Sequence, residues 1–405
     1  MDRKVVILRD LSSPNTHGPV GRGRGVGPSA RDFGPDGRAP APEPRIDVAD
    51  LSTRELRDLA RDPEVTSIAT VMPTRLIAPV AEDAAANPAA AGNSWGIAAV
   101  KADTSPFTGA GVVVCVLDTG IDPSHPAFAG VTLVQEDFSG SGNGDGQGHG
   151  THCAGTIFGR DLGGARIGIA RGVRKALIGK VLDNNGSGSS DMIFQGIRWA
   201  LENDAHVISM SLGFDFPGLV KELVTANGMP IEAATSEALE AYRANLRMFD
   251  ALMAMARARQ AFAHGSVVIA AAGNESSRNA NPAYEVAAAV PSAAEGVVSV
   301  AALQQGAGGL TVASFSNTFA QISAPGVSIL SAKPGGGTQT MSGTSMACPH
   351  VAGISALWWE AVLAGAVPPT ATMVVAKLLA NAATTGLAAG VDLADRGAGI
   401  AITPQ

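Results

Sequence analysis

The stretch GTSMACPHVAG, residues 343–353, combines a tight Gly-Thr entry with a helix that begins at Ser345. Pro349 is tolerated near a helix start, because the first backbone N–H groups of a helix have no partner inside it. Those N–H groups and the helix dipole can hold a developing negative charge beside the serine. The stretch alone fits two interpretations equally well: a nucleophile at an oxyanion site, or a buried helix with a serine N-cap.

Around this helix, apolar strands alternate with helical patterns from Trp95 onward, which is typical of a parallel β-sheet flanked by helices. The expected strands are 112–117, 176–181, 206–211, 266–272 and 297–301. The expected helices are 151–158, 190–203, 235–263, 345–364 and 369–382. We therefore predict an α/β fold for residues 95–405.

Three further polar segments each adjoin an apolar element. Asp118 ends an apolar strand and precedes Thr-Gly, at the strand end where ligands collect in parallel sheets. His149 begins a helix in the stretch GHGTHCAGT, and Asn274 follows a strand in AAGNE. Each alone has an ordinary structural explanation: a strand-ending aspartate, a structural or capping histidine, and a turn asparagine.

Together, these groups are those that nucleophilic acyl transfer requires. A serine hydroxyl such as that of Ser345 needs a base of near-neutral pKa, which His149 can supply. The imidazole needs a buried carboxylate, here Asp118, to fix its tautomer and stabilise its cation. The oxyanion needs converging donors, for which the Ser345 N–H and the Asn274 amide are candidates.

In order and near-identity, these segments resemble the motifs of the subtilisin-like serine proteases, the subtilases, over roughly residues 95–400. The resemblance implies a subtilisin-like fold and serine endopeptidase activity on peptides or proteins. It implies these catalytic residues: Asp118, His149, Ser345 and Asn274.

The same resemblance implies that a substrate lies as an added strand between two edges of a cleft. The substrate-binding residues are then Gly186, Ser187, Gly188, Ser211, Leu212, Gly213, Ala272 and Gly273. The small wall residues leave room for a sizeable apolar side chain before the cut bond, whereas Glu275 nearby favours a basic one. The side-chain preference therefore stays open.

Residues 1–80 are predicted to form a small α+β unit, in which Ser52 and Glu55 have the spacing of a capping box. Its segment 12–44 is rich in Pro, Gly and Arg and is expected to be a flexible insertion, and 81–94 a linker. The unit resembles the inhibitory prodomain of the subtilases, although this insertion replaces the expected first helix. The resemblance implies an autoinhibited zymogen, and we expect self-cleavage between about Met72 and Asn93.

Residues 214–264 form a segment longer than the usual subtilase connection, and we expect an extended helical insertion there. Apolar residues between 239 and 253 recur at helical spacing, which predicts one long amphipathic helix. Such a stripe normally packs on the main body; binding of a protein partner is the less common alternative.

Composition excludes several classes of function. A net charge of −7 gives no indication of nucleic-acid binding, and the apolar runs are too short to span a membrane. The N-terminus has only Val5–Leu8 as an apolar run, and a secretory signal needs roughly 7–15 such residues. The three cysteines, an odd number in apolar segments, are expected to be free and buried. Both observations favour the cytoplasm, unless a leader has been removed, in which case secretion is expected.

We expect no cofactor or metal. His149 and His152 could begin a zinc site, but no third and fourth ligand is evident. The calcium loop of many subtilases is not recognisable in 159–165, where Asp161 alone cannot form a cage of roughly six or more oxygens. Structural calcium elsewhere stays open.

Three functions remain as alternatives. The leading one is a serine endopeptidase acting through an acyl-enzyme. A peptide ligase or macrocyclase would use the same site with an amine in place of water. A latent binding or scaffold protein would result if the N-terminal unit were never cut.

Overall fold

The computed structural model describes residues 3–11, 44–80, 94–260 and 263–405. The predicted flexible insertion and linker, apart from residues 44 and 94, lie outside these ranges. Within them, no helix is long and apolar enough to cross a membrane.

The centre of the body is an eight-stranded sheet in the order β13-β12-β11-β9-β5-β7-β6, with β14 paired to β12. Every pairing in it is parallel except that of β13. Its strands are β5 (Val113–Asp118), β6 (Thr132–Asp137), β7 (Lys175–Lys180), β9 (Val207–Met210), β11 (Val267–Ala271), β12 (Val297–Gly306), β13 (Gly309–Val312) and β14 (Ile322–Pro325). The inner strands are apolar and buried because helices cover both faces.

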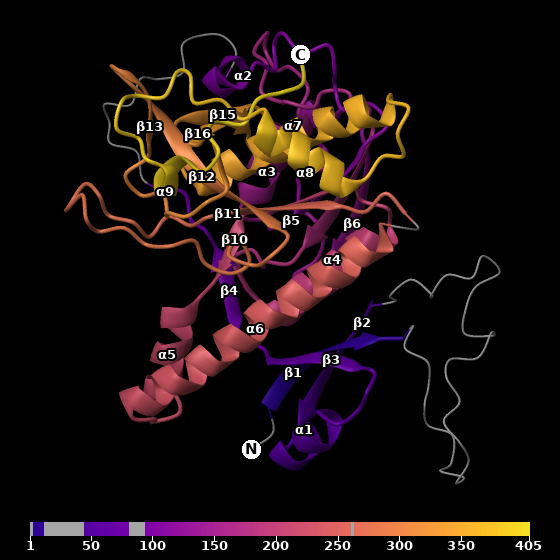
Figure 1. Ribbon diagram of the computed structural model, residues 1–405, viewed down its shortest axis with the longest axis vertical. Coiled ribbons are helices and arrows are strands. Elements are labelled where there is room, and N and C mark those ends of the chain that lie inside the picture. Colours follow the sequence, from indigo (N-terminus) through magenta and orange to yellow (C-terminus); the bar gives the residue numbers. More distant parts are fainter. Residues whose placement is uncertain (1–2, 12–43, 81–93, 261–262) are drawn as a thin grey trace, which may run out of the picture.

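Two layers of helices enclose the sheet (Figure 1). One layer contains α3 (His149–Phe158), α7 (Thr344–Leu363) and α8 (Ala371–Ala380). The other contains α4 (Ser190–Glu202) and α6 (Ile231–Arg259). Each layer shares a separate apolar cluster with one face of the sheet, which confirms the predicted α/β fold. Smaller elements are α2 (Trp95–Ala99), the short 3-10 helix η1 (Pro126–Phe128), β15 (Ile329–Ala332), β16 (Thr338–Met341) and α9 (Leu393–Arg396).

All predicted strands and helices of the body are present, with shifted ends. The sequence pattern predicts the long helix over 235–263, whereas α6 begins at Ile231 after Pro230 and ends at Arg259. A separate helix, α5 (Phe216–Thr225), precedes it; Asp215 caps α5, and Gly228 at φ 67° lies in the turn between the two helices. The strand β6 was missed because it lies at the sheet edge, where its residues are half-exposed and form no apolar run.

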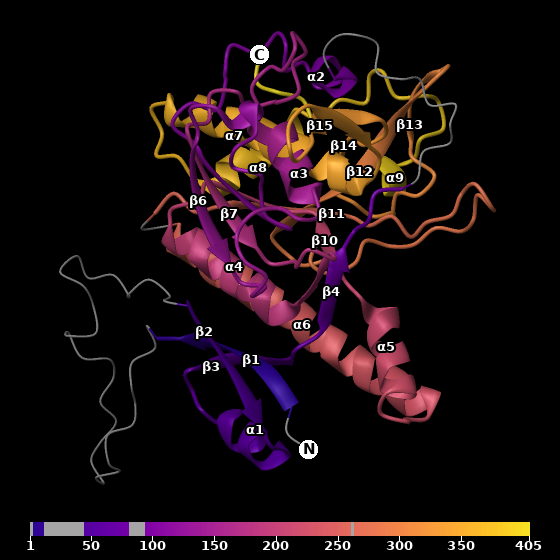
Figure 2. The same cartoon turned by 180° about the vertical axis from the view of Figure 1, so that it is seen from behind.

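The N-terminal unit, residues 3–11 and 44–80, contains β1 (Arg3–Asp10), β2 (Pro44–Leu51), α1 (Thr53–Leu59) and β3 (Val65–Thr70). The strands form an antiparallel sheet in the order β2-β1-β3, and the predicted capping box of Ser52 and Glu55 is confirmed. This sheet lies against α4 and α6, as the opposite view also shows (Figure 2). Val6 and Leu8 of β1 share one apolar cluster with Phe194 and Phe249, so the body completes the core of the unit.

One strand connects the unit to the body (Figures 1 and 2). Strand β4 (Pro73–Leu76) lies between β8 (Ser187–Ser189) and β10 (Leu212–Phe214), antiparallel to both. The two body strands are bridged only through β4 among the described residues. The chain's own residues 73–80 thus occupy the place predicted for a substrate peptide.

Candidate active site

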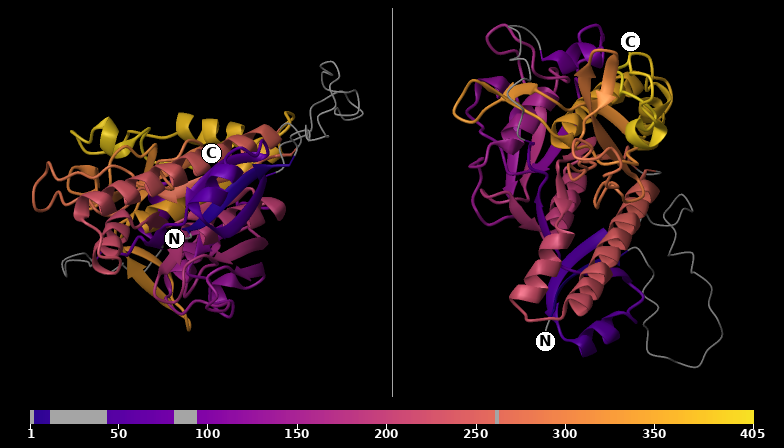
Figure 3. Two further views of the ribbon diagram at one scale, coloured as in Figure 1. Left: turned by 90° about the horizontal axis from the view of Figure 1, so that it is seen from below. Right: turned by 90° about the vertical axis from the view of Figure 1, so that its left-hand side faces the viewer.

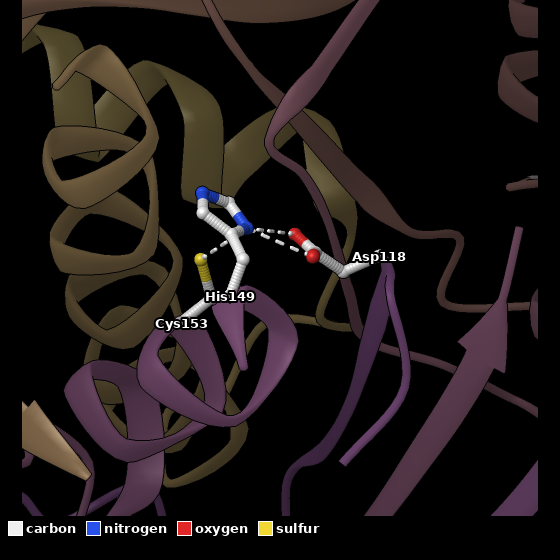
Figure 4. Close-up of side chains that lie close together, drawn as sticks. All are labelled: Asp118, His149 and Cys153. Carbon is white, nitrogen blue, oxygen red and sulfur yellow. Dashed lines mark hydrogen bonds and ion pairs between the residues drawn. The ribbon is translucent and has the colours of Figure 1, made fainter. Parts of the chain in front are cut away.

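Asp118 and His149 form a buried pair where the carboxyl end of β5 meets the start of α3 (Figure 4). The two carboxylate oxygens of Asp118 lie 2.8 and 3.0 Å from His149 Nδ1. Thr119 N–H donates to the same carboxylate at 2.7 Å. A carboxylate at Nδ1 holds the ring proton there and leaves Nε2 as the basic nitrogen. His149 Nε2 is buried and has no hydrogen-bond partner among the described residues.

Asp145 fixes the loop that leads into α3. Its carboxylate accepts hydrogen bonds from Thr119 Oγ1 at 2.9 Å, from Gly148 N–H at 2.7 Å and from Thr151 N–H at 2.8 Å. The first N–H groups of a helix need such acceptors, because they have no partner inside the helix. The position of His149 is therefore set by bonds within the body.

Lys180 supports the same loops from the end of β7. Its buried ammonium group donates to Thr119 O at 2.5 Å, to Gly144 O at 3.2 Å and to Asn184 Oδ1 at 2.9 Å. Burial lowers the pKa of Lys180, against the raising effect of nearby carboxylates. The sequence analysis predicted neither Lys180 nor Asp145 as part of the site. The sequence pattern that could have indicated Lys180 is a lysine at the end of an apolar strand.

Ser345 is the second residue of α7 and is fully buried. Its hydroxyl donates to the carbonyl oxygen of Ile77 at 2.9 Å. The Cys153 thiol lies 3.6 Å from His149 Nδ1 and donates to Ser345 O at 3.4 Å. This single thiol therefore contacts both His149 and Ser345, so the two residues lie on the same side of the cleft. The Ser345 hydroxyl, however, is directed to Ile77. We call the surface formed by Asp118, His149, Asn274, Thr344 and Ser345 the floor of the cleft.

Asn274 follows β11 with its side-chain amide in a fixed orientation. Its Oδ1 accepts hydrogen bonds from Thr344 N–H at 2.9 Å and from Thr344 Oγ1 at 2.8 Å. This leaves Nδ2 as the donor toward the cleft, where it bonds Ala78 O at 3.0 Å. Thr344, which directly precedes Ser345, is a positioning residue that sequence reasoning did not identify.

The predicted cleft edges contact residues 74–76 through their backbone. Leu212 pairs with Leu76 and Gly213 with Arg75, while Gly188 pairs with Thr74 and Ser187 with Arg75. Gly186 O accepts a hydrogen bond from Leu76 N–H at 2.8 Å. Ser211 Oγ donates to Ser345 O at 3.2 Å, which connects this edge to the cleft floor. The peptide between the edges is therefore held as an added strand.

The side chain of Ile77 occupies the predicted pocket. Ala272 and Gly273 line it together with Gly213, Phe214 and Val290, and a cavity of about 20 Å³ remains. The Glu275 carboxylate at the pocket mouth accepts a hydrogen bond from Asn317 Nδ2 at 2.7 Å. An aliphatic side chain therefore fills the pocket while the nearby carboxylate is engaged elsewhere.

The cysteines are all free and buried, as predicted. Asp118, His149 and Cys153 place ligand-type atoms within 4.8 Å of one another. Burial raises the pKa of the Cys153 thiol well above its ordinary value. The Nε2 atom of the neighbouring His152 lies 3.0 Å from Ile329 O. Burial lowers the pKa of His152 to about 3.

Comparisons with known proteins agree with this geometry. The sequence profile of the Subtilase family matches residues 109–399. The thermostable alkaline protease of Halalkalibacterium halodurans is 33% identical over 315 residues, which cover 76% of this chain and 71% of that protein. Subtilisin DY of Bacillus licheniformis is 35% identical over 271 residues, covering 65% of this chain and 83% of that protein. Subtilisin E of Bacillus subtilis is 33% identical over 318 residues, 76% and 69% of the respective chains.

The chain therefore belongs to the subtilase family and is a subtilisin-like serine endopeptidase. Every site residue predicted from the sequence lies at this cleft. Ser345 and Asn274 donate to the carbonyl oxygens of Ile77 and Ala78, and His149, held by Asp118, lies on the other side of Cys153 from the Ser345 carbonyl. The remaining residues form the edges and the pocket.

Proposed function

We propose that the chain hydrolyses peptide bonds through an acyl-enzyme on Ser345, with His149 as the general base, Asp118 as its orienting carboxylate and Asn274 as an oxyanion donor. One observation carries this assignment: a peptide strand crosses the cleft with the Ile77 carbonyl 2.9 Å from the Ser345 hydroxyl. The pairing of β4 with both cleft edges fixes the register of that strand.

The proposed reaction begins with formation of the acyl-enzyme. Ser345 Oγ bonds to the carbonyl carbon of the residue in the pocket while its proton moves to His149 Nε2. The negative charge passes to the carbonyl oxygen, where Asn274 Nδ2 and a backbone N–H at the start of α7 donate to it. The C–N bond then breaks, and His149 returns the proton to the leaving amine. A water molecule then gives a proton to the same imidazole and bonds through its oxygen to the acyl carbon. The bond from that carbon to Ser345 Oγ breaks, His149 returns the proton to Ser345 Oγ, and the carboxylic acid is released.

We further propose that the protein is made as an autoinhibited zymogen whose own residues 73–80 block the cleft. The Ser345 hydroxyl donates to the carbonyl oxygen of Ile77, whereas the Asn274 amide donates to the carbonyl oxygen of the next residue, Ala78. The two groups therefore bind two different carbonyls. Val80 N–H donates to Ser342 O at 2.8 Å, which holds the strand beyond this point as well. Attack requires the Ile77 carbonyl to shift toward Asn274. The bond between Ile77 and Ala78 is then the one cut.

The test uses full-length protein and its Ser345→Ala variant. The unaltered protein should release a species that begins at Ala78 and should cleave added peptides, whereas the variant should remain intact and inactive. Ser355→Ala is the matched control, because this serine lies buried in the same helix without a hydrogen-bond partner for its hydroxyl among the described residues. Undiminished peptidase activity in Ser345→Ala would refute the assignment of the nucleophile.

A second candidate is a latent protein whose N-terminal unit is never cut. The pairing of β4 with both cleft edges, which places the Ile77 carbonyl on the Ser345 hydroxyl, is the observation that favours it. A fluorophosphonate probe separates the two, since labelling of Ser345 after long incubation requires an accessible, activated hydroxyl. Protein that stays unlabelled and keeps its original N-terminus would support the latent form.

A further inference from the structure

The side chain of Arg75 reveals a charged contact at the cleft that the catalytic groups do not use. Ile77 fills the pocket beside Ser345, so Arg75 is the third residue before the proposed cut, counting Ile77 as the first. Its backbone is fixed on both sides, because it pairs with Gly213 of β10 and with Ser187 of β8. The direction of its side chain is thus set by strand geometry.

Asp215 receives this side chain. Arg75 Nη1 lies 3.4 Å from Asp215 Oδ1, and the side chains are 50% and 21% exposed. Asp215 N–H donates to Pro73 O at 3.0 Å, which extends the strand pairing by one contact. The carboxylate is itself anchored, since it caps α5 by accepting the Gly218 N–H at 3.0 Å. An anchored carboxylate loses little side-chain freedom when a cation binds it.

This carboxylate belongs to the inserted segment 214–264 rather than to the catalytic core. Phe216 and Leu223 of α5 pack with Ala234 and Ala238 of α6 in a small apolar cluster of their own, which holds the start of α5 in place. The two helices extend from the body beside the N-terminal unit, as the right-hand view of Figure 3 shows. The insertion thereby places the Asp215 carboxylate at one edge of the cleft.

We propose that Asp215 is a specificity-determining residue that selects a positively charged side chain at the third position before the cut bond. Arg75 is the only ion-pair partner of Asp215 among the described residues, so departure of residues 73–77 after the proposed cut leaves the carboxylate without a cation. The carboxylate that lines the pocket itself, that of Glu275, is held by Asn317. A substrate with arginine or lysine at this position restores the pair. The inference rests on the proposed peptidase activity of the same cleft.

The experiment compares peptides of the sequence Thr-X-Leu-Ile-Ala-Pro-Val in which X is arginine, glutamine or glutamate. Full-length protein is first incubated until its turnover of a reference peptide is constant, and kcat/KM is then measured for each peptide. Asp215→Asn removes the charge and keeps a residue that caps helices well. Glu222→Gln is the matched control, because it removes an exposed carboxylate of the same helix away from the cleft.

Arginine should be preferred over glutamine by about threefold to fivefold in kcat/KM, the range of a partly exposed ion pair, and over glutamate by more. The preference should shrink as salt is added and should disappear in Asp215→Asn, while Glu222→Gln retains it. Equal turnover of the three peptides, or a preference that survives in Asp215→Asn, overturns the inference and leaves the peptidase assignment intact. Failure to cleave any of them, with no fluorophosphonate labelling, overturns both.

Discussion

The floor of the cleft and its two edges are held in different ways. On the floor, Asp118 fixes His149, and Thr344 fixes Asn274, through bonds that lie wholly within the body. The edges β8 and β10 have no pairing with each other among the described strands and are bridged by β4 of the N-terminal unit. The body alone thus orients the His149 imidazole and the Asn274 amide, whereas the peptide site consists of two strands that are joined only by a third. Changes to the floor should alter the rate of catalysis, and changes to the bridging strand should alter when catalysis begins.

Removal of the Asn274 amide tests the floor and should cause the largest loss of activity among the substitutions predicted here outside the proposed catalytic residues Asp118, His149 and Ser345. Asn274→Ala should lower kcat by about 10²–10³, the loss known for the corresponding subtilisin donor, with little change in KM, because the bond is made mainly to the oxyanion. Steady-state kinetics on a peptide substrate measure the loss.

Thr344→Val provides the graded comparison for this prediction. It removes the hydroxyl that donates to Asn274 Oδ1 but keeps the Thr344 N–H bond at 2.9 Å, so kcat should fall by a smaller factor. A loss in Thr344→Val as large as that in Asn274→Ala would show that the orientation of the amide depends on the hydroxyl alone. No loss in Asn274→Ala would remove this residue from the mechanism.

The same contrast explains what could be predicted from the sequence. The floor could be predicted because Asp118, His149, Asn274 and Ser345 each lie in a contiguous stretch with a characteristic pattern. The ion pair of Arg75 with Asp215 joins segments far apart in the chain, and no local pattern predicts their pairing register. The role of Glu275 stays open in the sequence for the same reason, since its partner Asn317 comes from a distant loop.

The free energy of unfolding should depend on pH through His350, a residue of α7, the helix that carries Ser345. His350 is fully buried, and its Nδ1 lies 2.7 Å from Met346 O in a hydrogen bond. Burial lowers the pKa of His350 to about 4, despite the raising effect of that bond. Below the pKa of about 6.5 that the residue has in the unfolded chain, the unfolded state binds more protons than the folded one. The stabilisation is therefore complete above pH 6.5 and is lost progressively as the pH falls toward 4, by about 3 kcal/mol from this residue.

Denaturant unfolding at several pH values between 7 and 4, on inactive Ser345→Ala protein to prevent self-digestion, measures this loss. His350→Asn lacks the titrating ring, so its free energy of unfolding should fall less steeply over the same pH range. The slope should not vanish, because burial also lowers the pKa of His152 to about 3 and that of His206 to about 4. An identical slope in His350→Asn and its parent would contradict the assignment.

The smallest expected effect concerns the attachment of the N-terminal unit. Asn245 of α6 donates through Nδ2 to Thr70 O of β3 at 2.7 Å and to Ala241 O of its own helix at 2.9 Å. Asn245→Ala should weaken the attachment by about 1 kcal/mol, the net contribution of one such hydrogen bond, and should shorten the lag before peptidase activity appears. The final kcat should stay the same, because the hydrogen-bond partners of Asn245 in the described part of the chain are Thr70 and Ala241, and neither belongs to the floor.

The Asn381→Ala variant is the control. It removes a bond from an asparagine side chain to a carbonyl of its own helix, as Asn245→Ala does, but it removes no bond to the N-terminal unit. Asn381 makes the same type of bond to the carbonyl four residues earlier, at 2.8 Å to Lys377 O, but lies at the end of α8 in the helix layer opposite to that of α6. Its lag should match that of the unaltered protein. If both variants shortened the lag equally, general loss of stability would explain the effect, and control of the onset by the N-terminal unit would lose this support. A lower kcat in Asn245→Ala would contradict the separation of the floor from the edges, because a contact to the N-terminal unit would then affect the rate of catalysis.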